Sequence, residues 1–496
     1  MSSASLEETL PAAIIRGELG IRLDELDDDQ REFLEQQLTL VSRPWGDNPP
    51  RTVRCYREED GYLWIPRHFE PMSMWQLVEE WAWTTGRRYQ FRVKATLDPE
   101  RGQVKAVPAM IEYLKRHGAG VLCSGTGTGK TVSGLVIGAQ FESFIGIPVY
   151  NGHMVDHWTE DAMKVLGLSE DDIGIVQSDR CDLGRPVTIM MIQSLLARRY
   201  PDELYEQIGF LIGDETPHFG APEWKDTVGL FPARYRLGLT ANPTRKDGLD
   251  QIINWTFGEV GYTAKRIRTG AVQAPTVTAI FWKKTYPWGS YCKWEKDSSG
   301  QWEMGDEGHP SKYDNVLAGD EDRTDMLVEE IKNAAVKQRS ILVFSSRVDH
   351  LVEMREKLSR LLDPLTAIER LARLRAPPPN MPVTGHLKRG LKVNQRAWVL
   401  KADIIFATFA MARDAFDAPK LDTEFFGTPP GDPEQPAGRL REKAEGHDRK
   451  PLMIVEVYED TPYGRDKWCK RRDWFRRRGF KVQEVTRVPP RGKGRK

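Results

Sequence analysis

The sequence predicts an α/β protein in which two parallel-sheet domains follow one another, preceded by a smaller N-terminal α+β region. Apolar stretches with the pattern of strands alternate with helical stretches between about residues 105 and 265, and the alternation returns at about residue 322. Because consecutive parallel strands need a long crossover, usually a helix, this alternation is typical of parallel sheets. A chain of 496 residues also exceeds what one hydrophobic core supports, so several domains are expected.

Residues 1–104 are expected to form an accessory domain that contains a small sheet. The segment 26–38 has acidic residues before its apolar positions, as at the start of a helix. Asp60 and Gly61 stand between two stretches of alternating hydrophobicity, and Asp-Gly in that setting is a strong hairpin signal. A further helix is expected near residues 74–83.

The first parallel-sheet domain is predicted over residues 105–268. Ligands of such a domain bind at the carboxyl ends of the strands, where the connecting loops gather. Two of the expected helices cover residues 157–166 and 194–208. Strands are expected at residues 120–123, 145–150, 187–191, 210–214 and 236–240.

The rest of the chain is predicted to hold a connector or hairpin (269–321), a second parallel-sheet domain (322–464) and a basic C-terminal tail (465–496). The tail has fourteen Lys and Arg residues against three Asp and Glu, although the whole chain has a formal net charge of zero. A basic tail on a neutral protein indicates a polyanionic partner. A solvated tail that helps solubility is the alternative.

The composition, with 40% hydrophobic and 29% charged residues, is typical of a soluble globular protein. We find no run of about 18 apolar residues, so no membrane span is expected. The N-terminus lacks the basic and then apolar layout of a signal peptide, which favours a cytoplasmic location. The five cysteines lie far apart without a Cys-x-x-Cys pair, which argues against structural zinc and a disulfide scaffold. The sequence gives no prediction of the oligomeric state.

A glycine-rich loop between an apolar strand and a helix predicts a site for nucleotide phosphates. Glycines leave backbone N–H groups free to surround phosphate oxygens, and the helix N-terminus favours negative charge. A lysine can reach the outer phosphates, and the hydroxyl of the next residue can bind Mg²⁺. The loop consists of Gly125, Thr126, Gly127, Thr128 and Gly129, followed by Lys130 and Thr131, with Ser124 where the general pattern has glycine.

Two acids at the end of an apolar strand, Asp214 and Glu215, predict the second half of a phosphoryl-transfer site. Such chemistry needs a carboxylate that holds Mg²⁺ and a group that orients the attacking water. Asp214 is the candidate metal ligand, and Glu215 is the candidate base.

With these two motifs the chain resembles the superfamily 2 DNA helicases and translocases, most closely the phage-type DEAD/DEAH-box proteins and the UvsW- and XPB-like groups, over about residues 50–465. The resemblance implies two RecA-like domains that hold ATP and Mg²⁺ between them and move along nucleic acid, with DNA favoured over RNA. It also implies roles for individual residues. The corresponding positions are Gln103 for adenine, Thr240, Asn242 and Asp414 for coupling, Asp417 for the nucleotide, and Gln435, Arg439 and Arg441 for hydrolysis, the two arginines as fingers. Arg441 falls one position early, because Glu442 stands where the second family arginine often lies.

The chain departs from the family pattern at positions that concern coupling. Pro217 stands where the family box has a side chain that makes hydrogen bonds, and His218 follows one place late. Asn242 replaces a threonine, and Asp414 replaces a glutamate. Two alternatives therefore stay open: an ATP-gated DNA-binding clamp or scaffold with weak turnover, and the motor subunit of a larger nuclease complex.

Overall fold

The computed structural model divides the chain into two compact units, Met1–Thr269 and Gly270–Lys496, which are described here one at a time. The structure describes most of both units. The described residues are 12–43, 49–69, 79–125, 128–221, 224–245, 247–264, 275–296, 302–362, 384–387, 391, 393–413, 421–437 and 450–490.

The first unit begins with a five-stranded sheet in the order β5-β6-β2-β1-β7. Its Asp60-Gly61 turn has positive φ at both residues, 53° and 78°, as a type I′ hairpin requires. The predicted helix begins after Asp27, whose side chain accepts a hydrogen bond from the Gln30 backbone. The elements are β1 (Ala13–Ile15), β2 (Leu19–Arg22), α1 (Asp28–Gln37), β3 (Thr39–Val41), β4 (Thr52–Arg54), β5 (Arg57–Glu59), β6 (Tyr62–Ile65) and β7 (Glu80–Trp81).

The helix expected near residues 74–83 lies partly outside the described residues. Its C-terminal part differs from the expectation, because Glu80–Trp81 forms strand β7, which pairs with β1 in parallel. The backbone hydrogen-bonding groups that β1 leaves on its open side are thereby paired.

The larger sheet of the first unit has eight strands in the order β11-β10-β12-β9-β13-β14-β8-β15, all parallel except β11. The α/β class with parallel sheets is therefore confirmed. Its strands are β8 (Ala119–Ser124), β9 (Ile145–Val149), β10 (Ile173–Gln177), β11 (Arg180–Cys181), β12 (Val187–Met191), β13 (Phe210–Asp214), β14 (Tyr235–Thr240) and β15 (Val260–Ala264).

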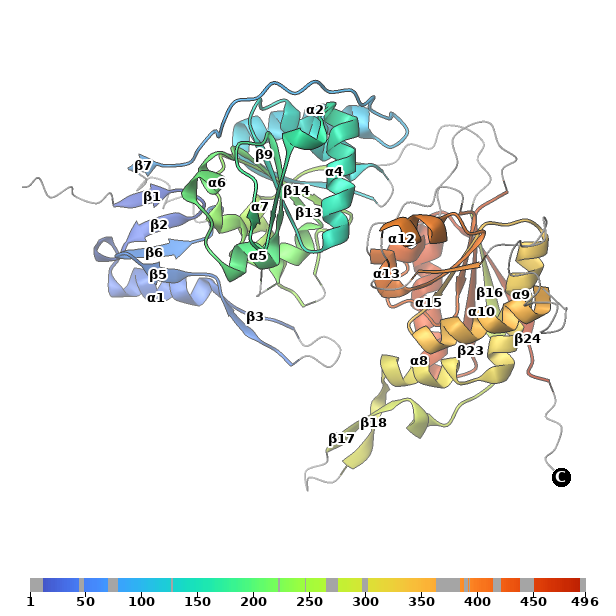
Figure 1. Cartoon of the computed structure of the whole chain (residues 1–496). Helices are drawn as coiled ribbons and strands as arrows, with labels where there is room; N and C mark the ends of the chain where they lie inside the picture. Colours follow the sequence, from blue (N-terminus) through green and yellow to red (C-terminus); the bar gives the residue numbers. More distant parts are fainter. Residues whose placement is uncertain are drawn as a thin grey trace, which may run out of the picture. The chain divides into compact units, whose positions relative to one another are not determined.

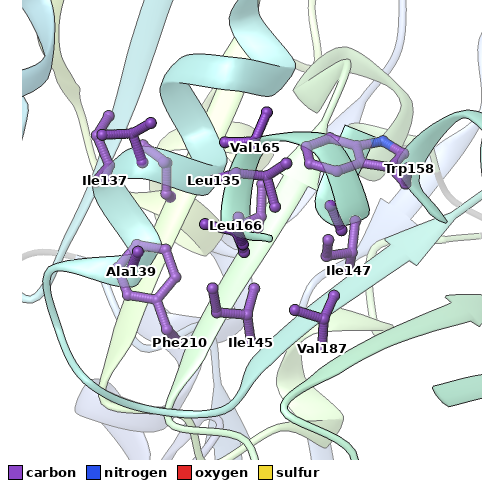
Figure 2. Packing of buried hydrophobic residues seen from close by; sticks show 14 of the residues in the cluster. Leu135, Ile137, Ala139, Ile145, Ile147, Trp158, Val165, Leu166, Val187 and Phe210 are labelled. Atoms are coloured by element: carbon purple, nitrogen blue, oxygen red, sulfur yellow. The ribbon is translucent and has the colours of Figure 1, made fainter. Parts of the chain in front are cut away.

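Helices cover both faces of this sheet (Figure 1). One face is covered by α2 (Gln103–His117), α3 (Lys130–Ala139) and α4 (Gly152–Leu166), and the other by α5 (Ile192–Ala197), α6 (Asp202–Glu206) and α7 (Asp250–Phe257). Strands buried on both faces have near-continuous apolar sequences, which is why five of them could be predicted. Figure 2 shows the first core, in which apolar side chains of α3 and α4 interdigitate with those of the strands, among them Leu135, Ile137, Trp158, Leu166, Ile145 and Phe210.

The helix expected over residues 194–208 is two short helices, α5 and α6. They are separated by residues 198–201, where Arg198 is extended and Pro201 precedes α6. Proline disfavours a helical conformation of the residue before it, so a continuous helix cannot pass through this position.

The N-terminal sheet is anchored to the larger sheet by two buried arginines, each only 1% exposed. Arg67 donates hydrogen bonds to the Ala233 and Arg234 carbonyls, at 2.8 and 3.1 Å. Arg236, on β14, donates to the carbonyls of Gly17 and Phe231. Burial lowers the pKa of both guanidinium groups, because each has lost its hydration.

The second unit has a seven-stranded, fully parallel sheet in the order β20-β21-β19-β22-β23-β16-β24. α9 and α10 cover one face, and α12 to α15 cover the other. Its strands are β16 (Thr276–Trp282), β19 (Ile341–Ser345), β20 (Thr384–Leu387), β21 (Ile404–Thr408), β22 (Thr423–Phe426), β23 (Met453–Glu459) and β24 (Lys481–Arg487). Its helices are α8 (Pro310–Ala318), α9 (Glu321–Val336), α10 (Val348–Leu362), α12 (Val393–Leu400), α13 (Phe409–Arg413), α14 (Glu434–Ala437) and α15 (Pro462–Arg477).

Two segments of this unit differ from their expected roles. Within the expected connector, β17 (Cys292–Lys296) and β18 (Trp302–Gly308) do form a hairpin, but β16 is an inner strand of the sheet, between β23 and β24. The expected basic tail contains α15 and β24. Trp468 and Phe475 bury one face of α15 in the core, so this segment is an integral part of the domain.

Across the described residues, none of the helices is both long and apolar enough to cross a membrane.

Replacing Arg236 with Met tests the anchoring of the N-terminal sheet. Several buried carbonyls would lose their donor, at about 1–3 kcal/mol each, so we expect a loss of about 3 kcal/mol or more in the free energy of unfolding of the first unit. Urea denaturation followed by circular dichroism measures it. The control is Arg88→Met, since the Arg88 side chain is 85% exposed. Equal midpoints for the two variants would contradict the anchoring role.

Candidate nucleotide site

The candidate site lies at the carboxyl ends of β13, β14 and β8, three adjacent strands of the first unit. The glycine-rich loop follows β8, the two acids end β13, and Thr240 ends β14. Because the strands are parallel, these three segments lie along one edge of the sheet. The sheet therefore brings together residues that are far apart in the sequence.

The described part of the glycine-rich loop is held by its own hydroxyl groups. The Thr128 hydroxyl lies 2.6 Å from that of Ser124 and donates to the Gly125 carbonyl at 2.7 Å. Gly129 has φ of 77° and directly precedes α3, which begins at Lys130. Ser124, which stands where the general pattern has glycine, thus serves as an anchor for the loop.

Gln103 supports the same loop from behind, at the start of α2. Its side-chain amide donates to the carbonyls of Thr128 and Gly129 at 2.8 and 3.2 Å and accepts from the Asp98 backbone at 2.8 Å. A Cβ atom on Gly129 would lie 2.4 Å from this amide nitrogen and would displace it, and the φ of 77° also favours glycine at this position. The contact of Gln103 with adenine, which the resemblance implies, stays a prediction; the hydrogen bonds of its amide show in addition that it supports the phosphate loop.

Lys130, Asp214 and Glu215 form the charged centre of the site. The Lys130 Nζ atom lies 3.9 Å from Glu215 Oε1, and the side chains are 12% and 31% exposed. Burial raises the pKa of the Asp214 carboxyl, and the positive charge of Lys130 opposes that rise. The Asp214 side chain is partly exposed and accepts a hydrogen bond from the Glu215 backbone at 3.0 Å, so its carboxylate can offer an oxygen to a cation.

Glu215 has a left-handed backbone, with φ of 51° and ψ of 61°. This conformation is uncommon for a residue with a β-carbon and is found most often where function requires it. It begins the short helix η4 (Thr216–Gly220), so the chain turns sharply at the end of β13. The turn fits closely over β14, where a Cβ atom on Gly238 would lie 2.5 Å from Thr216.

We call residues 240–245, from the end of β14, the coupling segment, because the resemblance predicts a coupling role for Thr240 and Asn242. This segment is tied to the turn after Glu215. Arg245 donates a hydrogen bond to the Pro217 carbonyl and forms an ion pair with Asp247. Thr240 and Asn242 form a compact turn, in which the Thr240 hydroxyl donates to the Asn242 carbonyl at 2.8 Å. Although Pro217 offers neither a side-chain partner nor a backbone N–H, its carbonyl links the two segments.

His218 forms a three-ring cluster with two aromatic residues that sequence reasoning missed, Tyr150 and Trp224. Its ring centroid lies 4.2 Å from that of Tyr150 and 5.6 Å from that of Trp224, and the Tyr150 and Trp224 centroids are 5.7 Å apart. The Tyr150 carbonyl also accepts a hydrogen bond from the exposed Gln193, at 2.9 Å. This contact connects the turn after Glu215 to the end of β12. No local sequence pattern indicates it, since Tyr150 follows β9, whereas His218 and Trp224 lie in the connection between β13 and β14.

The roles of all the predicted site residues stay predictions, including those of the residues not described above. Thr131 lies in the first turn of α3, and Gln435 lies in α14. The others fall outside the described residues: Thr126, Gly127, Asp414, Asp417, Arg439 and Arg441.

The fold and this site define a nucleotide-binding α/β protein of the phosphate-loop type, and comparisons with known proteins narrow the class. Residues 96–245 match the family described as "Type III restriction enzyme, res subunit". That range contains the loop, both acids and the coupling segment.

Sequence relatives cover both large and small parts of the chain. The chain is 24% identical over 474 residues to a protein of Acanthamoeba polyphaga mimivirus that carries the name "Putative ATP-dependent RNA helicase". The match covers 92% of this chain and 84% of the mimivirus protein. Over 160 residues, 31% of this chain and 28% of the other, the chain is 34% identical to the DNA 3'-5' helicase XPB of Kineococcus radiotolerans.

The fold also resembles a solved fragment that is named as an HsdR subunit of a type I restriction enzyme from Vibrio vulnificus. The TM-score is 0.52 at 16% identity, and the match covers 78% of this chain and 68% of that one. The chain is therefore a superfamily 2 helicase or translocase with tandem RecA-like domains, an ATP-hydrolysing protein that acts on nucleic acid.

Replacing Gln103 with Ala separates loop support from base recognition. Since the Gln103 amide holds the loop carbonyls, we expect ATP and GTP affinities to fall by the same factor, about 10-fold for the loss of roughly 1.4 kcal/mol of hydrogen bonding. Titration with fluorescent ATP and GTP analogues measures both. Lys105→Ala, an exposed change on the same helix, is the control. A loss confined to ATP would contradict loop support.

Replacing Tyr150 tests the aromatic contact with His218. We expect Tyr150→Ala to lower the nucleic-acid-stimulated ATPase rate more than the rate without nucleic acid, because the ring connects the Glu215 turn to the end of β12. Tyr150→Phe keeps the ring and is the matched control. Equal losses at both rates in the alanine variant would speak for a purely structural role.

Proposed function

We propose that the protein is an ATP-dependent translocase or helicase on DNA, with the nucleotide phosphates bound by the loop before α3. The observation that carries this proposal is the placement of Lys130 beside Glu215 and next to Asp214. Lys130 has the charge and position to bind the outer phosphates, and Glu215 can orient the attacking water and accept its proton.

The residues present fit Mg²⁺ as the companion of ATP. Among the described residues, no three Asp, Glu, His or Cys side chains gather into a site that could hold a metal alone. Mg²⁺ at a nucleotide usually keeps waters and takes one or two protein oxygens together with phosphates. The Asp214 carboxylate and the Thr131 hydroxyl would supply those oxygens. When bound, the ion would neutralise charge on the phosphates.

The family resemblance further assigns Gln435, Arg439 and Arg441 to hydrolysis, and we include these three residues in the proposal. An arginine that reaches the transferred phosphoryl group is worth roughly 10³–10⁵ in rate. A hydrolysis step that depends on such residues would couple the nucleotide to movement on nucleic acid.

DNA is favoured over RNA by the XPB-type relatives, whose names specify DNA. The mimivirus relative favours RNA instead, because its name specifies an RNA helicase. We therefore propose DNA as the substrate, bound mainly through phosphates with little reading of the base sequence.

ATP hydrolysis measured with single-stranded DNA, duplex DNA, forked DNA and RNA tests the proposal. We expect DNA to stimulate the rate more than RNA. Lys130→Ala removes the phosphate-binding cation and should lower the rate by about 100-fold or more. Glu215→Gln keeps the size of the side chain but not its basicity, so it should bind ATP while losing a comparable factor in hydrolysis.

The wild-type protein and the exposed variant Lys105→Ala serve as references for these rates. An ATPase that no nucleic acid stimulates would favour a clamp with weak turnover. Stimulation by RNA alone would overturn the choice of DNA.

A further inference from the structure

The amino ends of the strands in the second unit lie along one edge of its sheet. The register aligns the first residues of neighbouring strands, for example Thr276 with Met453 and Lys481, and Ile341 with Thr423 and Ile404. Because all the strands are parallel, the residues just before each strand share this edge. We call it the amino edge of the second sheet; the family's nucleotide and coupling motifs belong to the opposite, carboxyl edge.

The amino edge is strongly basic. Its described part comprises the residues up to five positions before each strand, together with the first residue of β24. Asp403 is the exposed acidic residue in these segments. The exposed basic residues are Lys337, Lys401, Arg476, Arg477, Arg478 and Lys481.

The fold itself uses other cations at this edge. Arg339 donates to the Thr423 hydroxyl and the Pro451 carbonyl, both at 3.0 Å, and lies 3.5 Å from Asp422. Lys450 donates to the Gln338 carbonyl at 2.7 Å. Both side chains are partly buried and hold the starts of neighbouring strands together. Within the exposed set, Arg477 donates to the Asp473 carbonyl at 3.3 Å and Arg478 lies over the Trp474 ring, so these two cations also contact their own helix, α15.

Helix ends account for part of the exposed charge, because cations near a helix C-terminus are stabilising by about 0.3–1 kcal/mol. α9, α12 and α15 all end at this edge, so one cation at each end has a structural explanation. Arg476, Arg477, Arg478 and Lys481 surround the end of α15 alone. Like charges at such spacing repel one another, so this excess is more favourable when an anion lies nearby.

The length of the amino edge matches a polyanion rather than a small anion. Five strand spacings separate β21 from β24, which is about 24 Å at roughly 4.8 Å per spacing. Duplex DNA presents one phosphate per about 1.7 Å of axis, hence about 14 over that length.

We propose that the amino edge of the second sheet is a second nucleic-acid contact, which binds the backbone phosphates of a duplex segment away from the motor's nucleotide and coupling motifs. The contact is independent of base sequence, since its cationic side chains bind phosphate oxygens, which are the same at every base pair. This inference rests on the proposed action on DNA.

The test neutralises Arg476, Arg477, Arg478 and Lys481 together by substitution with Gln in the full-length chain. Binding of a fluorescent duplex of about 40 base pairs is measured by anisotropy over a range of KCl concentrations. Each lost phosphate contact lowers the slope of log K against log salt by about 0.9. We expect the slope to fall by about 3, with affinity reduced at least about 10-fold at low salt and the ATPase rate without DNA unchanged.

The matched control removes four exposed cations of the first unit, Arg88, Lys115, Arg116 and Lys164, by the same substitutions. An unchanged slope in the first variant, or an equal change in both, overturns the proposal. A separate outcome tests the proposed function. If the wild-type protein binds the duplex but its ATPase rate does not rise, the proposed function is contradicted, while the comparison of salt slopes still tests the amino edge.

Discussion

The parallel pairing of β13 and β8 on either side of β14 is the constraint on which the nucleotide site depends. Neighbouring strands lie about 4.8 Å apart, so the loop after β8 and the acids after β13 are held roughly 10 Å apart at their backbones. Long side chains cover that distance, and Lys130 reaches to within 3.9 Å of Glu215. Gly213 and Gly238 are register partners in β13 and β14, and their lack of side chains lets the Glu215 turn and α7 pack directly on the sheet.

The same strand connects the site to the accessory sheet. Arg236 and Thr240 both belong to β14. Arg236 bonds to Gly17 of the N-terminal segment, whereas Thr240 begins the coupling segment. The accessory sheet is thus fixed to β14, the strand at whose end the coupling segment begins. Within the first unit, the two sheets are therefore expected to move as one body.

Much of the first domain could be predicted because burial on both faces leaves a continuous apolar strand with a motif at its end. β12 and β13 begin and end where they were expected. Expectations based on charge or aromatic content were less successful. The C-terminal segment looked like a tail because its arginines dominate the composition, yet Trp468 and Phe475 recur at helical spacing and bury one face. The pairing of Tyr150 with His218 could not be predicted, because it depends on how the connection after β9 meets the connection after β13.

The link between Arg245 and Pro217 passes through a main-chain oxygen. Every residue type carries that oxygen, so substitution at position 217 would leave this acceptor in place as long as the backbone keeps its path. Selection on this contact would therefore act on the arginine and on the shape of the turn, and scarcely on the identity of the residue that accepts. A family motif defined by side chains alone would count Pro217 as a mismatch, although the hydrogen bond between the two segments is still made.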